Sequence, residues 1–211
     1  MKKITNEFFI RFCDIIKRSL TDPLKIKDCL SDMVDASEDD NNHKLVYVDE
    51  KFNMEVLKLD EYSKDFNIKR HKELNLKVDH QPLSVDAVCV NKNNEWFLIE
   101  FKNEPIKNIL KSTPKKMHSS LWLIAFLYSK LSEKIGDESD ILKFAREHIT
   151  FITVVSSEKN KDFEEAIGVT WEPDGSFFVP EKFKKYKGYY FKDIYILTEL
   201  GLKFFIEAFD R

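Results

Sequence analysis

The stretch LSVDAVCVNKNNEWFLIEFKN, residues 83–103 of a 211-residue chain, constrains the fold more than any other segment. Two apolar runs flank a short polar turn, and this pattern predicts a β-hairpin. Asp86, Glu100 and Lys102 nevertheless place three charges within the two runs. Because a buried charge needs a partner, the hairpin must also explain how these charges are compensated.

The length of the turn decides whether the three charges meet. A three-residue loop ending at Asn94, which tolerates the left-handed conformation that such loops need, would place Asp86 opposite Glu100. Lys102, two residues beyond Glu100, would then point to the same face. A four-residue loop would instead place Asp86 opposite Ile99 and separate the charges. We favour the three-residue loop.

Two adjacent buried carboxylates need more positive charge than one lysine supplies. Both faces of the hairpin are apolar, as expected for a central strand pair that is covered on each side. A divalent cation would make the burial tolerable. Asp86, Glu100 and the backbone carbonyl of Phe101 would form an oxygen-rich corner suited to Mg²⁺ or Mn²⁺, with Lys102 beside a water on the ion.

Periodicity in the rest of the chain predicts one domain, residues 1–211, with a mixed α/β or α+β architecture in which helices flank a central mixed sheet. Helices are expected over 8–20 after a Thr5 cap, over 24–34, within 105–131 with Thr113 as cap before Pro114, and after a Thr198 cap. Strands are expected at 45–48, 74–78, 149–155 and 192–197, with a second hairpin over 166–180. Residues 35–44 predict an acidic loop, and residues 50–70 are ambiguous.

Asp86 followed by Glu100-Phe101-Lys102 resembles the D…(D/E)xK signature of the PD-(D/E)xK nuclease superfamily, also called the restriction endonuclease-like fold. The resemblance implies a core of helix, three-strand meander, helix and strand over about residues 70–155, with N-terminal helical and C-terminal strand and helix additions. It also implies that Asp86 and Glu100 bind magnesium, and that Lys102 helps to activate or orient the attacking water. That role is chemically reasonable, because a metal lowers the pKa of its bound water.

The chain departs from the family pattern at several positions. Val85 stands where a proline is common. Many members add an acid from the first helix, for which Glu7 and Asp14 are candidates. One branch carries Gln-x-x-x-Tyr after the lysine, and here His118 and Trp122 occupy a comparable place.

Basic residues beyond the motif indicate where a nucleic acid would bind. Lys107, Lys111, Lys115, Lys116 and His118 are predicted to contact the phosphate backbone, the alternative being a solvated helix face. Residues 183–192, FKKYKGYYFK, mix lysines with aromatic side chains that would either stack on bases or, as we favour, fill a core.

Composition limits the remaining functions. With 34 basic and 37 acidic residues, the chain as a whole does not attract nucleic acid, so binding requires a local patch. Cys13, Cys29 and Cys89 lack the spacing of a zinc site or a disulfide framework. Neither a signal peptide nor a membrane-spanning stretch is evident, which predicts a cytoplasmic protein without a membrane partner. Nucleotide-binding glycine motifs and serine-hydrolase motifs are absent from the sequence.

The resemblance therefore implies metal-dependent hydrolysis of phosphodiester bonds, in DNA rather than RNA. The alternative is a nuclease-like scaffold without turnover that binds nucleic acid or protein. The oligomeric state, a homo-oligomer included, stays open.

Overall fold

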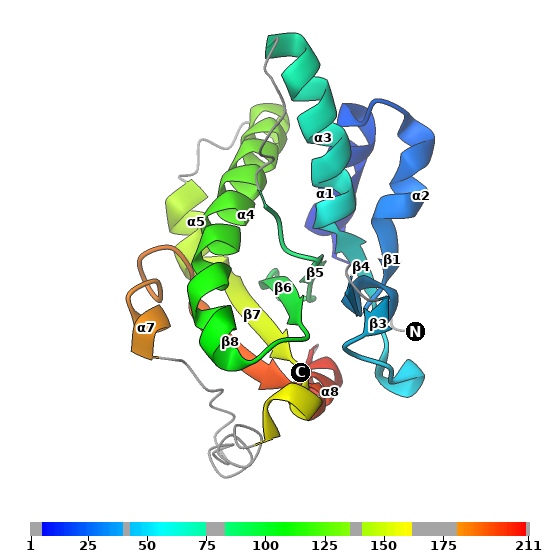
Figure 1. Cartoon of the computed structure of the whole chain (residues 1–211). Coiled ribbons are helices and arrows are strands. Elements are labelled where there is room, and N and C mark those ends of the chain that lie inside the picture. Colours follow the sequence, from blue (N-terminus) through cyan, green and yellow to red (C-terminus); the bar gives the residue numbers. More distant parts are fainter. Residues whose placement is uncertain (1–5, 40–42, 75–82, 136–140, 162–180, 210–211) are drawn as a thin grey trace.

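The computed structural model describes residues 6–39, 43–74, 83–135, 141–161 and 181–209. A six-stranded mixed sheet lies at its centre (Figure 1). The strands follow one another in the order β1 (Leu30–Asp32), β4 (Glu55–Lys58), β5 (Ala87–Val90), β6 (Trp96–Lys102), β7 (Ile149–Val155) and β8 (Asp193–Thr198). Neighbours from β1 to β6 are antiparallel, whereas β6, β7 and β8 are parallel. A separate two-stranded sheet pairs β2 (Glu38–Asp39) with β3 (Lys44–Leu45).

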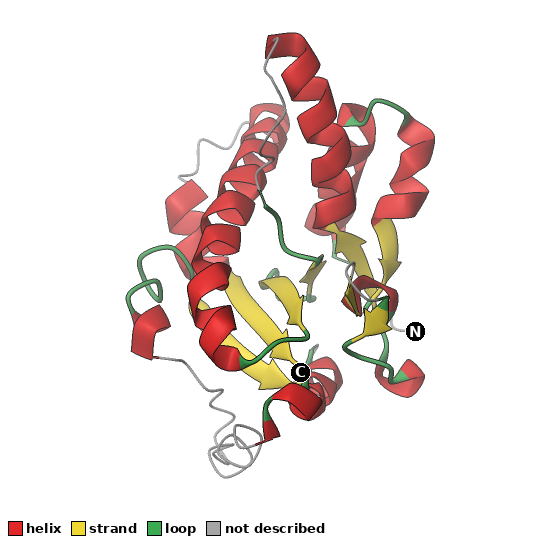
Figure 2. Ribbon diagram, in the orientation of Figure 1, coloured by secondary structure: helices red, strands yellow, loops and turns green. Residues whose placement is uncertain are grey.

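Helices flank the central sheet (Figure 2), so the protein is a mixed α/β fold. The α-helices are α1 (Glu7–Ser19), α2 (Ile26–Cys29), α3 (Leu59–Leu74), α4 (Ile106–Ile135), α5 (Ile141–His148), α7 (Glu181–Lys184) and α8 (Glu199–Ala208). Short 3-10 helices are η1 (Pro23–Lys25), η2 (Asp35–Ser37), η3 (Glu50–Phe52) and η4 (Ser157–Lys159). Although α4 is 30 residues long, neither it nor another helix in the described ranges has an apolar stretch that would cross a membrane.

The hairpin of β5 and β6 has the predicted register. Val88 pairs with Leu98 and Val90 pairs with Trp96. Asn94 takes the left-handed conformation, with φ of 60°. The side chain of Asn91 accepts hydrogen bonds from two backbone N–H groups of the turn, which fixes the short loop. The three-residue loop is therefore the correct alternative.

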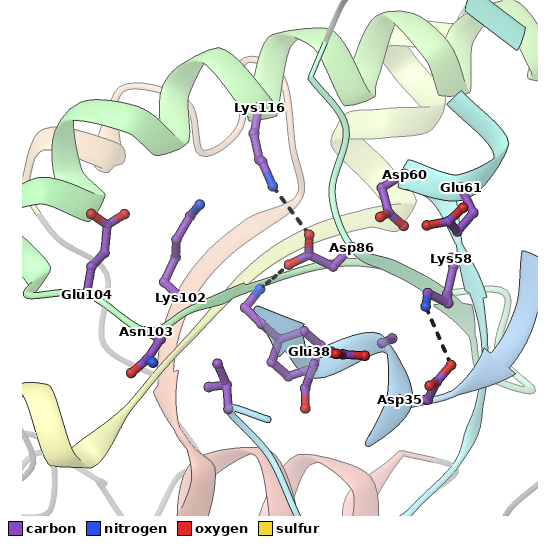
Figure 3. Close-up of a pocket in the computed structure, with 14 residues that line it drawn as sticks. Asp35, Glu38, Lys58, Asp60, Glu61, Asp86, Lys102, Asn103, Glu104 and Lys116 are labelled. Atoms are coloured by element: carbon purple, nitrogen blue, oxygen red, sulfur yellow. Dashed lines mark hydrogen bonds and ion pairs between the residues drawn. The ribbon is translucent and has the colours of Figure 1, made fainter. Parts of the chain in front are cut away.

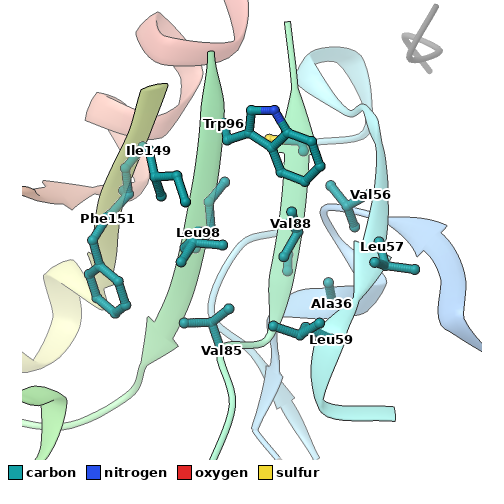
Figure 4. Packing of buried hydrophobic residues seen from close by; sticks show 14 of the residues in the cluster. Ala36, Val56, Leu57, Leu59, Val85, Val88, Trp96, Leu98, Ile149 and Phe151 are labelled. Carbon is teal, nitrogen blue, oxygen red and sulfur yellow. The ribbon is translucent and has the colours of Figure 1, made fainter. Parts of the chain in front are cut away.

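Both faces of the sheet are covered by helices. The ring of Trp96 in β6 lies 4.9 Å from that of Phe12 in α1, whereas Phe97, on the opposite face, lies 4.8 Å from Phe205 in α8. Figure 4 shows how the side chains of neighbouring strands pack together beside Trp96. Because strand side chains alternate, Glu100 lies on the same face as Trp96, beneath the layer of α1 and α4.

The long helix α4 begins earlier than the predicted cap at Thr113 and Pro114. Its first residue, Ile106, donates its backbone N–H to the side chain of Asn160, at 2.8 Å. This cap comes from a residue distant in sequence, which local patterns do not reveal. Ile109, in the first turns of α4, is fully buried and anchors them to the core. The helix therefore starts before Pro114, which lies inside it although proline removes one backbone hydrogen bond.

Several other predicted elements agree with the structure. The strand predicted at 149–155 is β7, and β8 at Asp193–Thr198 matches the one predicted at 192–197. Thr198 caps α8 by accepting a hydrogen bond from the backbone of Gly201. The first helix is also present, but its cap is Asn6, since Thr5 lies outside the described residues.

Other predictions need correction. The helix predicted at 24–34 is only the four-residue α2, because the chain then enters the edge strand β1. The strand predicted at 45–48 is limited to Leu45, since Val46 and Tyr47 leave the ladder and are buried. The ambiguous residues 50–70 form η3, β4 and most of α3.

The first strand of the meander also differs from the prediction. Leu74 ends α3, and the rest of the strand predicted at 74–78 lies outside the described residues, as does the hairpin predicted over 166–180. Instead, β4 pairs with β5, as in the contact between Leu57 and Val88. The meander therefore starts at Glu55, before the predicted boundary near residue 70.

Candidate functional site

Asp86 and Glu100, hereafter the acid pair, meet on one face of the sheet. Asp86 immediately precedes β5, and its Oδ2 accepts a 2.6 Å hydrogen bond from the backbone N–H of Phe101 in the next strand. The Glu100 side chain is fully buried, whereas that of Asp86 is 21% exposed. The two carboxylates also share one cation, because Nζ of Lys116 lies 3.3 Å from Asp86 Oδ1 and 2.6 Å from Glu100 Oε1. The predicted convergence of the acids is thus present.

Two lysines, one from the sheet and one from a helix, compensate the acid pair. Lys102 on β6 places its Nζ 2.7 Å from Glu100 Oε1, and Lys116 on α4 donates a 2.8 Å hydrogen bond to Glu100 Oε2. Glu100 Oε1 makes its two ion pairs without a well-directed hydrogen bond from a described residue. An ammonium group therefore lies where the sequence predicts a divalent ion.

The shared environment shifts the ionisation of these groups. Desolvation, together with the nearby Glu100 carboxylate, raises the pKa of Asp86 to about 7. Desolvation by itself lowers the pKa of Lys116, but the Glu100 and Asp86 carboxylates raise it above the ordinary value. Lys116 thus stays charged near neutral pH, while Asp86 is close to its midpoint. Shifts of this kind are frequent at functional sites.

A polar cavity of about 470 Å³ opens beside Asp86 (Figure 3), and the buried Glu100 is not among its lining residues. Its charged lining comes from the end of β4, the start of α3, the segment before β5, the end of β6 and the residues after it, η2, β2 and α4. These residues are Asp35, Glu38, Asp60, Glu61, Asp86 and Glu104 among the acids, and Lys58, Lys102 and Lys116 among the bases. Acidic side chains outnumber lysines here, so the cavity attracts cations more readily than a bare phosphate backbone.

Asp60 is the acid that the sequence analysis missed. It lies in the first turn of α3, directly after β4, and its Oδ1 is buried without a hydrogen-bond partner in the described part of the chain. Desolvation and the Asp86 carboxylate raise the pKa of Asp60 to about 6. Glu7 and Asp14, the predicted helix-borne acids, are exposed on α1 and do not line the cavity. The Asp60-Glu61 pair after an apolar run was a usable signal, because acids favour a first helical turn.

The oxygen donors fit magnesium in type but are few in number. Magnesium is commonly held by one or two carboxylates and completes its octahedron with waters or substrate oxygens. Asp86 and Glu100 supply such a pair, and Glu100 Oε1 lacks a directed hydrogen bond. Among the residues that the structure describes, no three or more His, Cys, Asp or Glu side chains are grouped to hold a metal. The fit therefore rests on two carboxylates. The Phe101 carbonyl as a third ligand stays a prediction.

The basic residues predicted to bind nucleic acid divide into two groups. Lys107, Lys111, Lys115 and His118 are exposed on α4 and do not line the cavity, whereas Lys116 points inward to the acid pair. Successive residues of a helix point about 100° apart, which explains why Lys115 is exposed to solvent while Lys116 contacts the acid pair. Because α4 begins at Ile106, neither lysine lies in its first turn, as the predicted Thr113 cap would require.

The FKKYKGYYFK segment, residues 183–192, contains both buried and exposed aromatic side chains. Phe183, Tyr186 and Phe191 are buried, in agreement with the favoured core interpretation, while Tyr189 is 72% exposed. The ring of His118 lies 5.6 Å from those of Tyr186 and Tyr190, so this segment packs beside the outer face of α4.

Comparisons with protein-family models, with curated proteins and with solved structures found no match for this chain. The interpretation of the site therefore depends on its geometry and chemistry.

Proposed function

We propose that the protein hydrolyses phosphodiester bonds in nucleic acid, DNA rather than RNA, with Mg²⁺ or Mn²⁺ at the acid pair. The observation that carries this proposal is the convergence of Asp86 and Glu100 on one sheet face, with Lys102 2.7 Å from Glu100. The order of elements also supports a restriction endonuclease-like core. Strands β4, β5 and β6 are antiparallel neighbours, with α3 inserted between β4 and β5; α4 and α5 follow, and β7 then joins parallel to β6.

Each residue of the site would have a distinct role in the reaction. A bound divalent ion would lower the pKa of a water and offset negative charge on the phosphate. Asp86, oriented by the Phe101 N–H, and Glu100, held by burial, would be the ligands. Lys102 would orient the attacking water and stabilise the developing hydroxide, because its ammonium already lies beside Glu100 at the cavity wall. The water attacks phosphorus as the bond to the leaving oxygen breaks.

The outer face of α4 is the proposed contact for flanking phosphates. Lys107, Lys111 and Lys115, hereafter the outer lysines, are exposed and form no ion pair with another described residue. Each lysine that contacts a phosphate releases condensed counterions, which supplies affinity without sequence preference. His118, next to two tyrosine rings, would extend this surface.

A scaffold without turnover is the second candidate. It is favoured by the two lysines, which compensate the acid pair without a metal, and by the acidic majority in the cavity lining. On this hypothesis the cluster of Asp86, Glu100, Lys102 and Lys116 has a structural role only.

Cleavage assays separate the two candidates. We expect the wild type to nick plasmid or degrade single-stranded DNA with Mn²⁺ and to be inactive with EDTA. Asp86→Ala and Lys102→Ala should each abolish the activity, while Lys143→Met, an exposed control on α5 that lies outside both the cavity lining and the outer lysines, should leave cleavage largely intact. Equal traces of cleavage by the wild type and all variants would identify a contaminating nuclease. Inactivity of the wild type on every DNA and RNA substrate would favour the scaffold.

A further inference from the structure

The position of Lys116 is fixed by the packing of α4 against the sheet as well as by its ion pairs. The neighbouring turn of α4 is tied to the segment before β5 that carries Asp86, because the side chain of Ser120 accepts a 2.9 Å hydrogen bond from the backbone N–H of Val85. Val85 directly precedes Asp86. Ser120 and Met117 are both fully buried, so the inner face of α4 is fixed against the sheet. The position of Lys116 is thus part of the core.

The ammonium group of Lys116 takes up the space between the two carboxylates. It lies 2.6 Å and 2.8 Å from the two oxygens of Glu100, and 3.3 Å from Asp86 Oδ1. The lysine side chain is only 18% exposed. A magnesium ion binds carboxylate oxygens at about 2.0–2.1 Å, so it would compete with the ammonium group for the same oxygens. Two cations at this separation also repel each other strongly in a partly buried site.

We propose that Lys116 is an internal counter-cation, which neutralises the acid pair when no metal is bound and is displaced when a divalent ion enters. The long side chain makes the displacement feasible without movement of the helix, because four rotatable bonds allow the ammonium to swing toward the cavity that it already lines. Metal binding then breaks the ion pairs of Lys116, and the site takes up a divalent ion more weakly than two free carboxylates would. This inference rests on the proposed function, since it requires a site for a divalent ion.

The role differs from that of Lys102. Of the two acids, Lys102 forms an ion pair only with Glu100, whereas Lys116 forms ion pairs with both. Removal of Lys102 would leave the bridge between the carboxylates in place. Removal of Lys116 would leave the two acids without the group that joins them.

The test is metal binding by Lys116→Met, which keeps an unbranched side chain one heavy atom shorter than lysine and removes the charge. Titration calorimetry with Mn²⁺ should show tighter binding than in the wild type by at least about tenfold, a difference of about 1.4 kcal/mol. Lys115→Met, an adjacent exposed substitution of the same type, should bind like the wild type. Lys116→Gln, whose amide still donates a hydrogen bond to one carboxylate, gives the same comparison if the methionine variant does not fold.

Thermal unfolding supplies a second readout that does not depend on cleavage. Relative to the wild type, Lys116→Met or Lys116→Gln should have a lower Tm in EDTA and a larger rise in Tm on addition of Mn²⁺. Metal binding that is equal in the wild type and both variants, or weaker in the variants, would overturn the counter-cation role and leave the proposed function intact. If neither the wild type nor the variants bound a divalent ion, the counter-cation role and the metal-dependent function would both be wrong.

Discussion

Lys115 and Lys116 are neighbours in sequence, yet they belong to different parts of the molecule. Lys115 is exposed on the outer face of α4, whereas Lys116 is 18% exposed and contacts both members of the acid pair. The two side chains are chemically identical. Their difference shows that the phase of a helix against the sheet, rather than residue type or local charge, decides whether a lysine supports the core or meets solvent.

The same division runs along the helix. The inner face carries the fully buried Thr113, Met117 and Ser120. The outer face carries the exposed lysines and His118. Substitutions on the inner face should therefore change stability and metal binding, and those on the outer face should change only the binding of a polyanion.

The largest loss of stability is expected for Lys116→Met in EDTA. Removal of one partner from a buried ion pair leaves uncompensated charge, so the free energy of unfolding should fall by about 3 kcal/mol at pH 8. Lys115→Met should change it by less than about 0.5 kcal/mol. Urea denaturation of both variants measures the difference. Similar small changes in the two would mean that the acid pair does not depend on Lys116.

Asp86→Asn should stabilise the metal-free protein at pH 8. The folded pKa of Asp86, about 7, lies above its ordinary value of 3.8, so the wild type loses stability as the pH rises from about 4 to 7. Asparagine does not ionise, so the variant avoids this decrease. Above pH 7 its free energy of unfolding should exceed that of the wild type by up to about 4 kcal/mol. The gain should shrink toward pH 4. Urea denaturation in EDTA across this pH range measures it, and a gain independent of pH would contradict the assigned cause.

Thr113→Val tests a buried hydroxyl on the inner face of α4. Thr113 Oγ1 has no hydrogen-bond partner in the described ranges, and an unpaired buried polar group is costly. Valine has a similar shape, so the free energy of unfolding should rise by about 1 kcal/mol. Ser112→Ala, on the adjacent and less buried position, should be nearly neutral. Thermal or urea unfolding compares them, and a lower stability of Thr113→Val would indicate that the hydroxyl has a partner outside the described ranges.

The smallest effect is expected from the double change Lys111→Ala and Lys115→Ala. Its stability should match that of the wild type, while affinity for a DNA oligonucleotide should fall several-fold. The slope of log affinity against log salt concentration should decrease by roughly 0.7–0.9 for each phosphate that the variant no longer neutralises. Fluorescence anisotropy in an Asp86→Asn background measures binding without cleavage. An unchanged slope would exclude the outer face as the phosphate-binding surface.

Local patterns predicted the centre of the fold well. The register that joins Asp86 to Glu100, the left-handed Asn94 and the strand at 149–155 all follow from short-range rules of turn geometry and burial. The start of α4 did not follow, because its cap is the side chain of Asn160. Asp60 was missed for a related reason, since β4 and α3 follow each other without a turn that separates strand from helix.

The sequence by itself determined that two acids and a lysine meet on paired strands, because alternation and turn length act over only a few residues. Only the tertiary structure decided which cation lies between the acids. The choice of Lys116 over Lys115 depends on where α4 begins and how it lies on the sheet, and both are set by interactions between segments far apart in the chain.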